Sequence, residues 1–95
     1  MSGANFTRTN LTEAFLSQVN LLLRANLSNA RLNYATLNNA KLNEADLNGA
    51  ELIGANLFSA SLTNADLRGA DLTGANLMYA DLQGFSQKVR KTHVG

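Results

Sequence analysis

The sequence predicts an all-β solenoid, in which short extended sides alternate with tight corners, and three observations support this prediction. Leucine stands at every fifth position from Leu27 to Leu82. Alanine stands two residues before each of these leucines. Glycine or asparagine fills most of the positions two residues after them. A chain of 95 residues with so regular a pattern is one small repeating domain.

A period of five residues fits neither a helix nor a flat strand. An α-helix turns by about 100° per residue, so steps of five scatter the leucines around its circumference. In a flat strand, an odd step places alternate leucines on opposite faces. An alanine and the leucine two residues later, such as Ala65 and Leu67, do share one face of a short extended segment. Both point inward at every repeat only if the next two residues form a corner.

At the second residue of each corner, the frequency of glycine and asparagine predicts a positive φ angle. Type II turns require this conformation there, and glycine and asparagine tolerate it. Other residue types occupy the same position in four repeats, so we expect more than one turn type. These residues are Tyr34, Glu44, Ser59 and Tyr79.

The first four repeats are less regular than the rest. Their central residues are Phe6, Leu11, Leu16 and Leu21, and the step from Leu21 to Leu27 is six residues. One extra residue therefore lies within 19–24, where we expect a bulge. We also expect Phe6, Leu11 and Leu16 to be partly exposed at the open end of the solenoid, unless a second molecule covers them.

From about residue 4 to residue 84, the chain resembles the pentapeptide-repeat family, whose unit reads A-(D/N)-L-x-x. The direct matches are ADLNG (45–49), ANLFS (55–59), ADLRG (65–69) and ADLTG (70–74). The resemblance implies a right-handed quadrilateral β-helix of about four coils, with about twenty residues in each coil. Positions twenty apart would then lie on adjacent coils.

Residues 85–95 leave the pattern, so we divide the chain into a β-helix at 1–84 and a C-terminal capping segment and tail at 85–95. Phe85 stands where the next alanine would be, and Val89 follows four residues later. Both would lie on one face of a short helix, and we expect them to form a lid over the last coil. The basic residues of the tail either contact phosphates or an acidic partner or are simply solvated; they are Lys88, Arg90 and Lys91.

Composition excludes several classes of function. The chain has no cysteine, a net charge of +1 and no apolar run near the roughly 20 residues of a membrane span. The one histidine, His93, lies in the tail, and the pattern places no base beside any serine or threonine. We therefore expect no enzymatic activity, cofactor, metal, small-molecule substrate, direct nucleic-acid binding or membrane insertion. The start of the chain does not resemble a signal peptide, so we expect a cytoplasmic protein.

Acidic residues form two columns in the four-sided arrangement, Asp46 with Asp66 and Glu51 with Asp71. Some members of the pentapeptide-repeat family protect DNA gyrase by presenting an acidic, DNA-like rod, and these residues are where such a surface would lie. The alternative is that the position before the central leucine simply accepts aspartate or asparagine, as it does throughout the repeats.

Apolar residues form a second candidate surface. Phe58 lies twenty residues before Met78, so the two are expected to touch, with Tyr79 alongside and Phe15 on the first coil. Exposed apolar stripes often mark binding sites, although scattered apolar surface residues are ordinary.

These observations favour a non-enzymatic scaffold or protein-interaction module. It would bind a protein through an outer side or a coil end, and we include a homodimer formed through a coil end in this expectation. The alternative is a DNA-mimicking inhibitor of DNA gyrase.

Overall fold

The computed structural model describes residues 3–20 and 22–84. The expected C-terminal lid with Phe85 and Val89 lies outside the described residues, as do His93 and the basic residues of the tail. Within the described ranges, the chain contains no helix and no strand longer than a single bridge residue. The fold is therefore built from turns and isolated parallel bridges.

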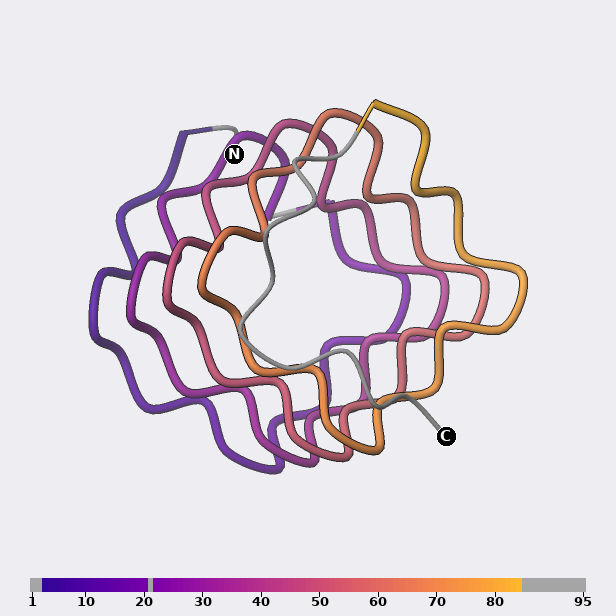
Figure 1. The fold of residues 1–95 in the computed structure, drawn as a ribbon, viewed down its shortest axis with the longest axis horizontal. Helices are drawn as coiled ribbons and strands as arrows, with labels where there is room; N and C mark the ends of the chain where they lie inside the picture. Colours follow the sequence, from indigo (N-terminus) through magenta and orange to yellow (C-terminus); the bar gives the residue numbers. More distant parts are fainter. Residues whose placement is uncertain (1–2, 21, 85–95) are drawn as a thin grey trace.

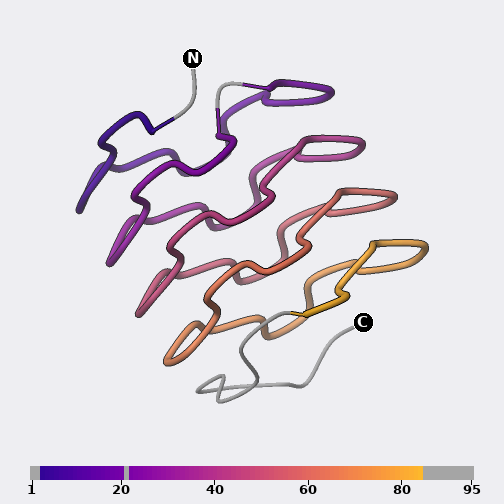
Figure 2. The ribbon, with the colours of Figure 1, turned by 90° about the horizontal axis from the view of Figure 1, so that it is seen from above.

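The chain winds into a stack of four-cornered coils (Figures 1 and 2). Each bridge residue pairs in parallel with the residue at the same position on the coils before and after it, and these pairs form four ladders. We name the sides of the stack after their ladders: side A (Asn5, Asn26, Asp46, Asp66), side B (Asn10, Arg31, Glu51, Asp71), side C (Phe15, Thr36, Asn56, Asn76) and side D (Lys41, Ser61, Asp81).

Alanine and leucine fill the interior, as their spacing predicts. From Ala25 to Ala75, every inward alanine and leucine is at most 4% exposed. The coils are joined by main-chain hydrogen bonds of a repeating kind. The Leu27 N–H donates to the Asp46 carbonyl at 2.7 Å, and the Asp46 N–H donates to the Ala25 carbonyl at 2.9 Å. Side-chain packing and backbone pairing therefore stabilise the same stacked arrangement.

The corners share one conformation, so the expectation of more than one turn type is wrong. Tyr34, Glu44, Ser59 and Tyr79 have φ angles of 57° to 62°, as the asparagines at this position do. The Ala35 N–H closes its turn by donating to the Leu32 carbonyl at 3.1 Å, the bond of a type II turn. The Tyr34 N–H also donates to the Ile53 carbonyl of the next coil at 2.8 Å. Such bonds depend only on the backbone and offset the cost of about 1–2 kcal/mol for a left-handed residue.

The expected bulge is confirmed by a change of register. Phe15 pairs with Thr36, 21 positions later, whereas Asn26 pairs with Asp46, 20 positions later. Leu22 is 1% exposed, and its carbonyl accepts the Ala25 N–H at 3.0 Å, which are the features of a central residue. The predicted centre, Leu21, lies outside the described residues, and Leu22 takes its place. The insertion therefore falls between Val19 and Leu22.

The two ends of the stack are less well covered than its middle. Phe6, Leu11 and Leu16 in the first coil are only partly buried, as expected. In the last coil, Leu77 and Leu82 are also only partly buried. Core residues of the two middle coils have a coil on each side, whereas these five residues have a coil of the described chain on one side only.

Candidate protein interaction surface

The exposed large apolar residues of the described chain all lie on side C or at its corners. They are Phe15 (89% exposed), Tyr34 (60%), Met78 (58%) and Tyr79 (77%). Phe15 belongs to the ladder of side C. Tyr34 lies at the corner where the chain enters side C, and Met78 and Tyr79 form the corner where it leaves. Apolar exposure is therefore concentrated on one of the four sides.

The structure brings together three of the four apolar residues singled out from the sequence. Phe58 and Met78 occupy the same corner position on adjacent coils, and the Ser59 N–H beside them donates to the Met78 carbonyl at 2.9 Å. The Phe58 ring meets the Tyr79 ring edge to face, with centroids 5.4 Å apart. Pairs of this geometry add to the stability expected from burial alone.

Phe15 stands apart from this group. It lies on the first coil, where the neighbouring Ser17 hydroxyl donates to Asn38 Oδ1 of the second coil at 2.7 Å. The second coil, with Thr36 and Asn38, therefore separates Phe15 from Phe58 on the third.

Tyr34 is the residue that the sequence analysis missed, because it considered Tyr34 only as a corner residue. A Cβ atom placed on Gly54, at the same corner of the next coil, would lie 2.6 Å from the Tyr34 ring. The ring thus covers the Gly54 corner. The signal was available in the sequence, since Tyr34 directly precedes the side C residues of the second coil.

Side C is also the one side without charge. The four segments that form it contain no Asp, Glu, Lys or Arg; they are 14–19, 35–39, 55–59 and 75–79. Its two corners in the described coils add a single charged residue, Glu13. The core of a protein interface differs from other surface in having few charged residues and many aromatic residues and methionines. Side C has this composition.

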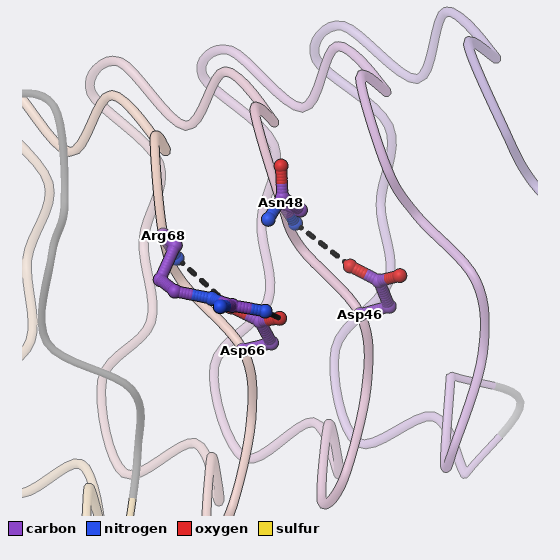
Figure 3. Close-up of polar contacts among 4 residues, drawn as sticks. All are labelled: Asp46, Asn48, Asp66 and Arg68. Carbon is purple, nitrogen blue, oxygen red and sulfur yellow. Dashed lines mark hydrogen bonds and ion pairs between the residues drawn. The ribbon is translucent and has the colours of Figure 1, made fainter.

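The acidic columns form where the sequence predicts them, but local groups bind their carboxylates. Asp46 pairs with Asp66 on side A. The Asn48 N–H donates to Asp46 Oδ1 at 3.0 Å, and the Arg68 guanidinium holds both Asp66 oxygens at 2.9 and 2.7 Å (Figure 3). Hydrogen bonding from Arg68 lowers the pKa of Asp66 below its ordinary value of 3.8.

The acidic column on side B is still less available to a partner. Asp71 is only 7% exposed, and its Oδ1 accepts the Thr73 N–H at 3.1 Å and the Thr73 hydroxyl at 2.6 Å. Glu51 accepts a bond of 2.9 Å from the Asn33 amide. These two carboxylates therefore act within the fold.

A shared role explains the aspartate or asparagine before the central leucine, and the sequence analysis did not identify it. The side-chain Oδ1 accepts the N–H of the residue two positions later, so that it caps the corner. Besides Asp46, Asp66 and Asp71, the residues that do this are Asn5, Asn10, Asn26, Asn56, Asn76 and Asp81. The signal was the frequency at this position of aspartate and asparagine, whose short side chains carry a carbonyl oxygen that can bond to the backbone two residues later.

Metal and membrane sites find no support in the part of the chain that the structure describes. It contains no group of three or more His, Cys, Asp or Glu that could hold a metal ion. It contains no helix long and apolar enough to cross a membrane. Its buried side-chain nitrogen and oxygen atoms all have hydrogen-bond partners.

Comparisons with known proteins agree with this geometry. The family model described as Pentapeptide repeats matches residues 1–21, 22–57 and 55–84, in 8 copies. No curated protein matches the chain. The pentapeptide repeat protein alr5209 from Nostoc Pcc 7120 is 40% identical, with a TM-score of 0.66. Rfr23 from the cyanobacterium Cyanothece 51142 is also 40% identical, with a TM-score of 0.51. In both cases, 87% of this chain aligns with 64% of the other, so the chain spans less than two thirds of these relatives.

Proposed function

The chain belongs to the pentapeptide repeat family, and from this premise we propose that it is a non-enzymatic scaffold that binds a protein through side C. Membership implies the right-handed quadrilateral β-helix, and proteins of this family are generally scaffolds without enzymatic activity. The function of such a protein depends on what its outer sides present to a partner. The four sides of this chain differ sharply in what they present.

The observation that carries the proposal is the coincidence of two properties on side C. Together with its two corners it carries all four exposed large apolar residues of the described chain, and the same surface carries a single charged residue, Glu13. Protein interfaces have both properties at their centres. The corner formed by Phe58, Met78 and Tyr79 is the natural anchor, because its rings already pack against each other and lose little side-chain freedom on binding.

A pull-down tests this proposal. The wild-type chain is immobilised and exposed to a lysate of the source cells in which its own gene is deleted, so that self-association cannot supply the captured protein. We expect Phe58→Ser and Met78→Ser to lose a protein that the wild type captures. Lys41→Ser, an exposed change on side D, is the matched control and should retain it. Equal capture by the wild type and both side C variants would contradict the proposal, as would no capture at all.

A DNA-mimicking inhibitor of DNA gyrase is the second candidate, favoured by the stacking of Asp46 on Asp66. The Arg68 guanidinium neutralises part of that charge, and Asp71 is buried, so the acidic field is weaker than the sequence suggests. Titration of the purified chain into a gyrase supercoiling assay separates the candidates. We expect no inhibition. Inhibition that disappears in the Asp46→Asn/Asp66→Asn double variant would favour the DNA mimic, because asparagine keeps the corner bonds and removes only the charge.

A further inference from the structure

We infer that side C of the free protein is covered by a second copy of this chain, packed face to face about a twofold axis parallel to the stack of coils. The inference rests on the proposed function, because it takes the same surface and names what covers it before a different protein binds there. Three properties of side C lead to it: the shapes of its two corners, the chemistry of its ladder and its lack of charge.

The two corners of side C carry residues of different size at every level of the stack. The entry corner carries Glu13, Tyr34, Gly54 and Gly74 on the first to fourth coils. The exit corner carries Ser17, Asn38, Phe58 and Met78 on the same coils. In the first two coils the larger side chain is at the entry corner, and in the last two it is at the exit corner.

A twofold axis parallel to the stack places the entry corner of one copy against the exit corner of the other, coil by coil. Met78 of one copy then faces Gly74 of the other. A Cβ atom on Gly74 would meet only backbone atoms of Gly54, at 3.8 and 3.9 Å, so no side chain of the described residues beyond its two chain neighbours lies within 4 Å of that position. Phe58 faces Gly54, where the Tyr34 ring of the other copy offers an aromatic surface. Each of these contacts occurs twice in the dimer.

The ladder of side C lies along the axis, so each of its residues faces its own copy. Asn56 and Asn76 carry amides that both donate and accept, and Thr36 carries a hydroxyl that does the same, so identical residues can bond to each other. Phe15 faces Phe15 at the end of the ladder.

The other three sides are unsuited to this arrangement. Their ladders would place like charges opposite each other, which disfavours association. The residues concerned are Asp46 and Asp66 on side A, Arg31, Glu51 and Asp71 on side B, and Lys41 and Asp81 on side D. Side C is the one side that can face itself without this repulsion.

The size of side C sets the expected strength of the dimer. Four coils at a spacing of about 4.8 Å span roughly 19 Å. The described chain has principal extents of 31, 26 and 22 Å, so a whole side covers no more than about 600 Å². Twice this area is at the small end of specific interfaces, so we expect a dissociation constant in the micromolar range.

Sedimentation velocity of the purified chain from about 1 to 300 μM tests the inference. We expect the wild type to pass from monomer to dimer across this range. Asn56→Asp should weaken the dimer at least tenfold, because it sets two carboxylates against each other on the axis. The variant keeps its corner bond to the Phe58 N–H, since Asp46 and Asp66 make the same bond in their repeats. Asn26→Asp, the matched change on side A, should leave dimerisation unchanged.

Charge exchange tests the position of the axis. Asn56→Asp mixed with Asn56→Lys should form a heterodimer more readily than either variant forms a homodimer, because an axis parallel to the stack places residue 56 opposite itself. A perpendicular axis that overlaps all four coils would instead place it opposite Thr36. A wild type that remains a monomer throughout overturns the inference. So does a dimer that Asn56→Asp does not weaken, which would point to contact through a coil end.

The two proposals fail separately. The pull-down uses a lysate without this chain, so capture by a monomeric protein would support the scaffold and overturn the second-copy inference. A dimer formed through side C, together with no captured protein, would support the second-copy inference and contradict the scaffold.

Discussion

The side-chain oxygen before each central leucine contributes to the fold more than its exposure suggests. Asp66 Oδ1 accepts the Arg68 N–H at 3.1 Å, and the same bond recurs wherever aspartate or asparagine holds this position in the described chain. Such a bond contributes about 0.5–1.5 kcal/mol. Where glutamate replaces them at position 51, Asn33 Oδ1 of the preceding coil accepts the Ile53 N–H instead, at 2.9 Å. The N–H two residues after this position therefore has a side-chain acceptor in both arrangements.

Two variants of Asp66 separate its role as a cap from its ion pair. Asp66→Asn keeps an Oδ1 for the corner and should lose only the contribution of the ion pair with Arg68. Asp66→Ala loses the cap as well, and we expect a further loss of about 1 kcal/mol in the free energy of unfolding. Urea denaturation followed by circular dichroism measures both. Equal stabilities for the two variants would show that the cap contributes nothing.

The same residue predicts a pH dependence with a definite sign. Arg68 lowers the pKa of Asp66 in the folded state below its ordinary value of 3.8. The ion pair therefore stabilises the fold fully at pH values above the pKa of this carboxyl in the unfolded chain. This contribution is lost as the pH falls through the lower, folded-state pKa. The stability difference between wild type and Asp66→Asn should therefore be present at pH 7 and vanish in strong acid. A difference that grows on acidification would contradict this assignment.

One pentapeptide, a short side followed by a type II corner, is the element of this fold. It buries two side chains, and its corner closes through the backbone, which is why Tyr79 takes the same φ of about 62° that Asn39 takes at 63°. The element has no stability of its own, since its other main-chain hydrogen bonds lead to neighbouring coils. The contribution of one pentapeptide to the free energy of unfolding therefore depends on its position in the stack.

The same substitution should have different effects in different coils. Leu47 is fully buried between two coils, and its truncation in Leu47→Ala should cost about 2–5 kcal/mol. Leu11 lies in the first coil and is only partly buried, so Leu11→Ala should cost less than half as much. Thermal and urea unfolding of both variants measure this difference. Equal losses would mean that the first coil is as well covered as the third.

The sequence predicts the inward residues, the corners and the insertion. The first two recur every five residues, and the insertion appears as the one step of six residues. Leucine at 47 and alanine at 45 can be assigned from spacing alone. The uniform φ of the corners could not be predicted, because it depends on bonds between coils and not on the residue at the corner. The sequence places Arg68 beside the acidic column that contains Asp66, but the two bonds from its guanidinium to the carboxylate depend on the folded corner and could not be predicted. Tyr34 was overlooked because its importance depends on its neighbours on side C.

At the scale of the whole molecule, the fold is a one-dimensional stack in which each coil contacts only its neighbours. Such proteins have stabilities close to a sum over repeats and the contacts between them. Four coils share three interfaces, and the coils at both ends contain the partly buried core residues. A surface such as side C exists only because each ladder residue lies directly above its counterpart on the preceding coil. The proposed binding function therefore depends on a five-residue repeat that continues without interruption from coil to coil.

Deletion of one whole coil should shorten the molecule without changing its fold. Removal of residues 41–60 joins Ala40 to Ser61 and continues the pattern of alanine, ladder residue and leucine. Three coils with two interfaces remain, so we expect a folded protein that has lost about a third or more of its free energy of unfolding, with a smaller urea m-value. Removal of residues 41–58 instead leaves two surplus residues in the coil, which turns the following leucines away from the core. That variant should fail to unfold cooperatively. If the 20-residue deletion unfolds the chain while the 18-residue deletion does not, the coil is not the unit on which the stability of this molecule depends.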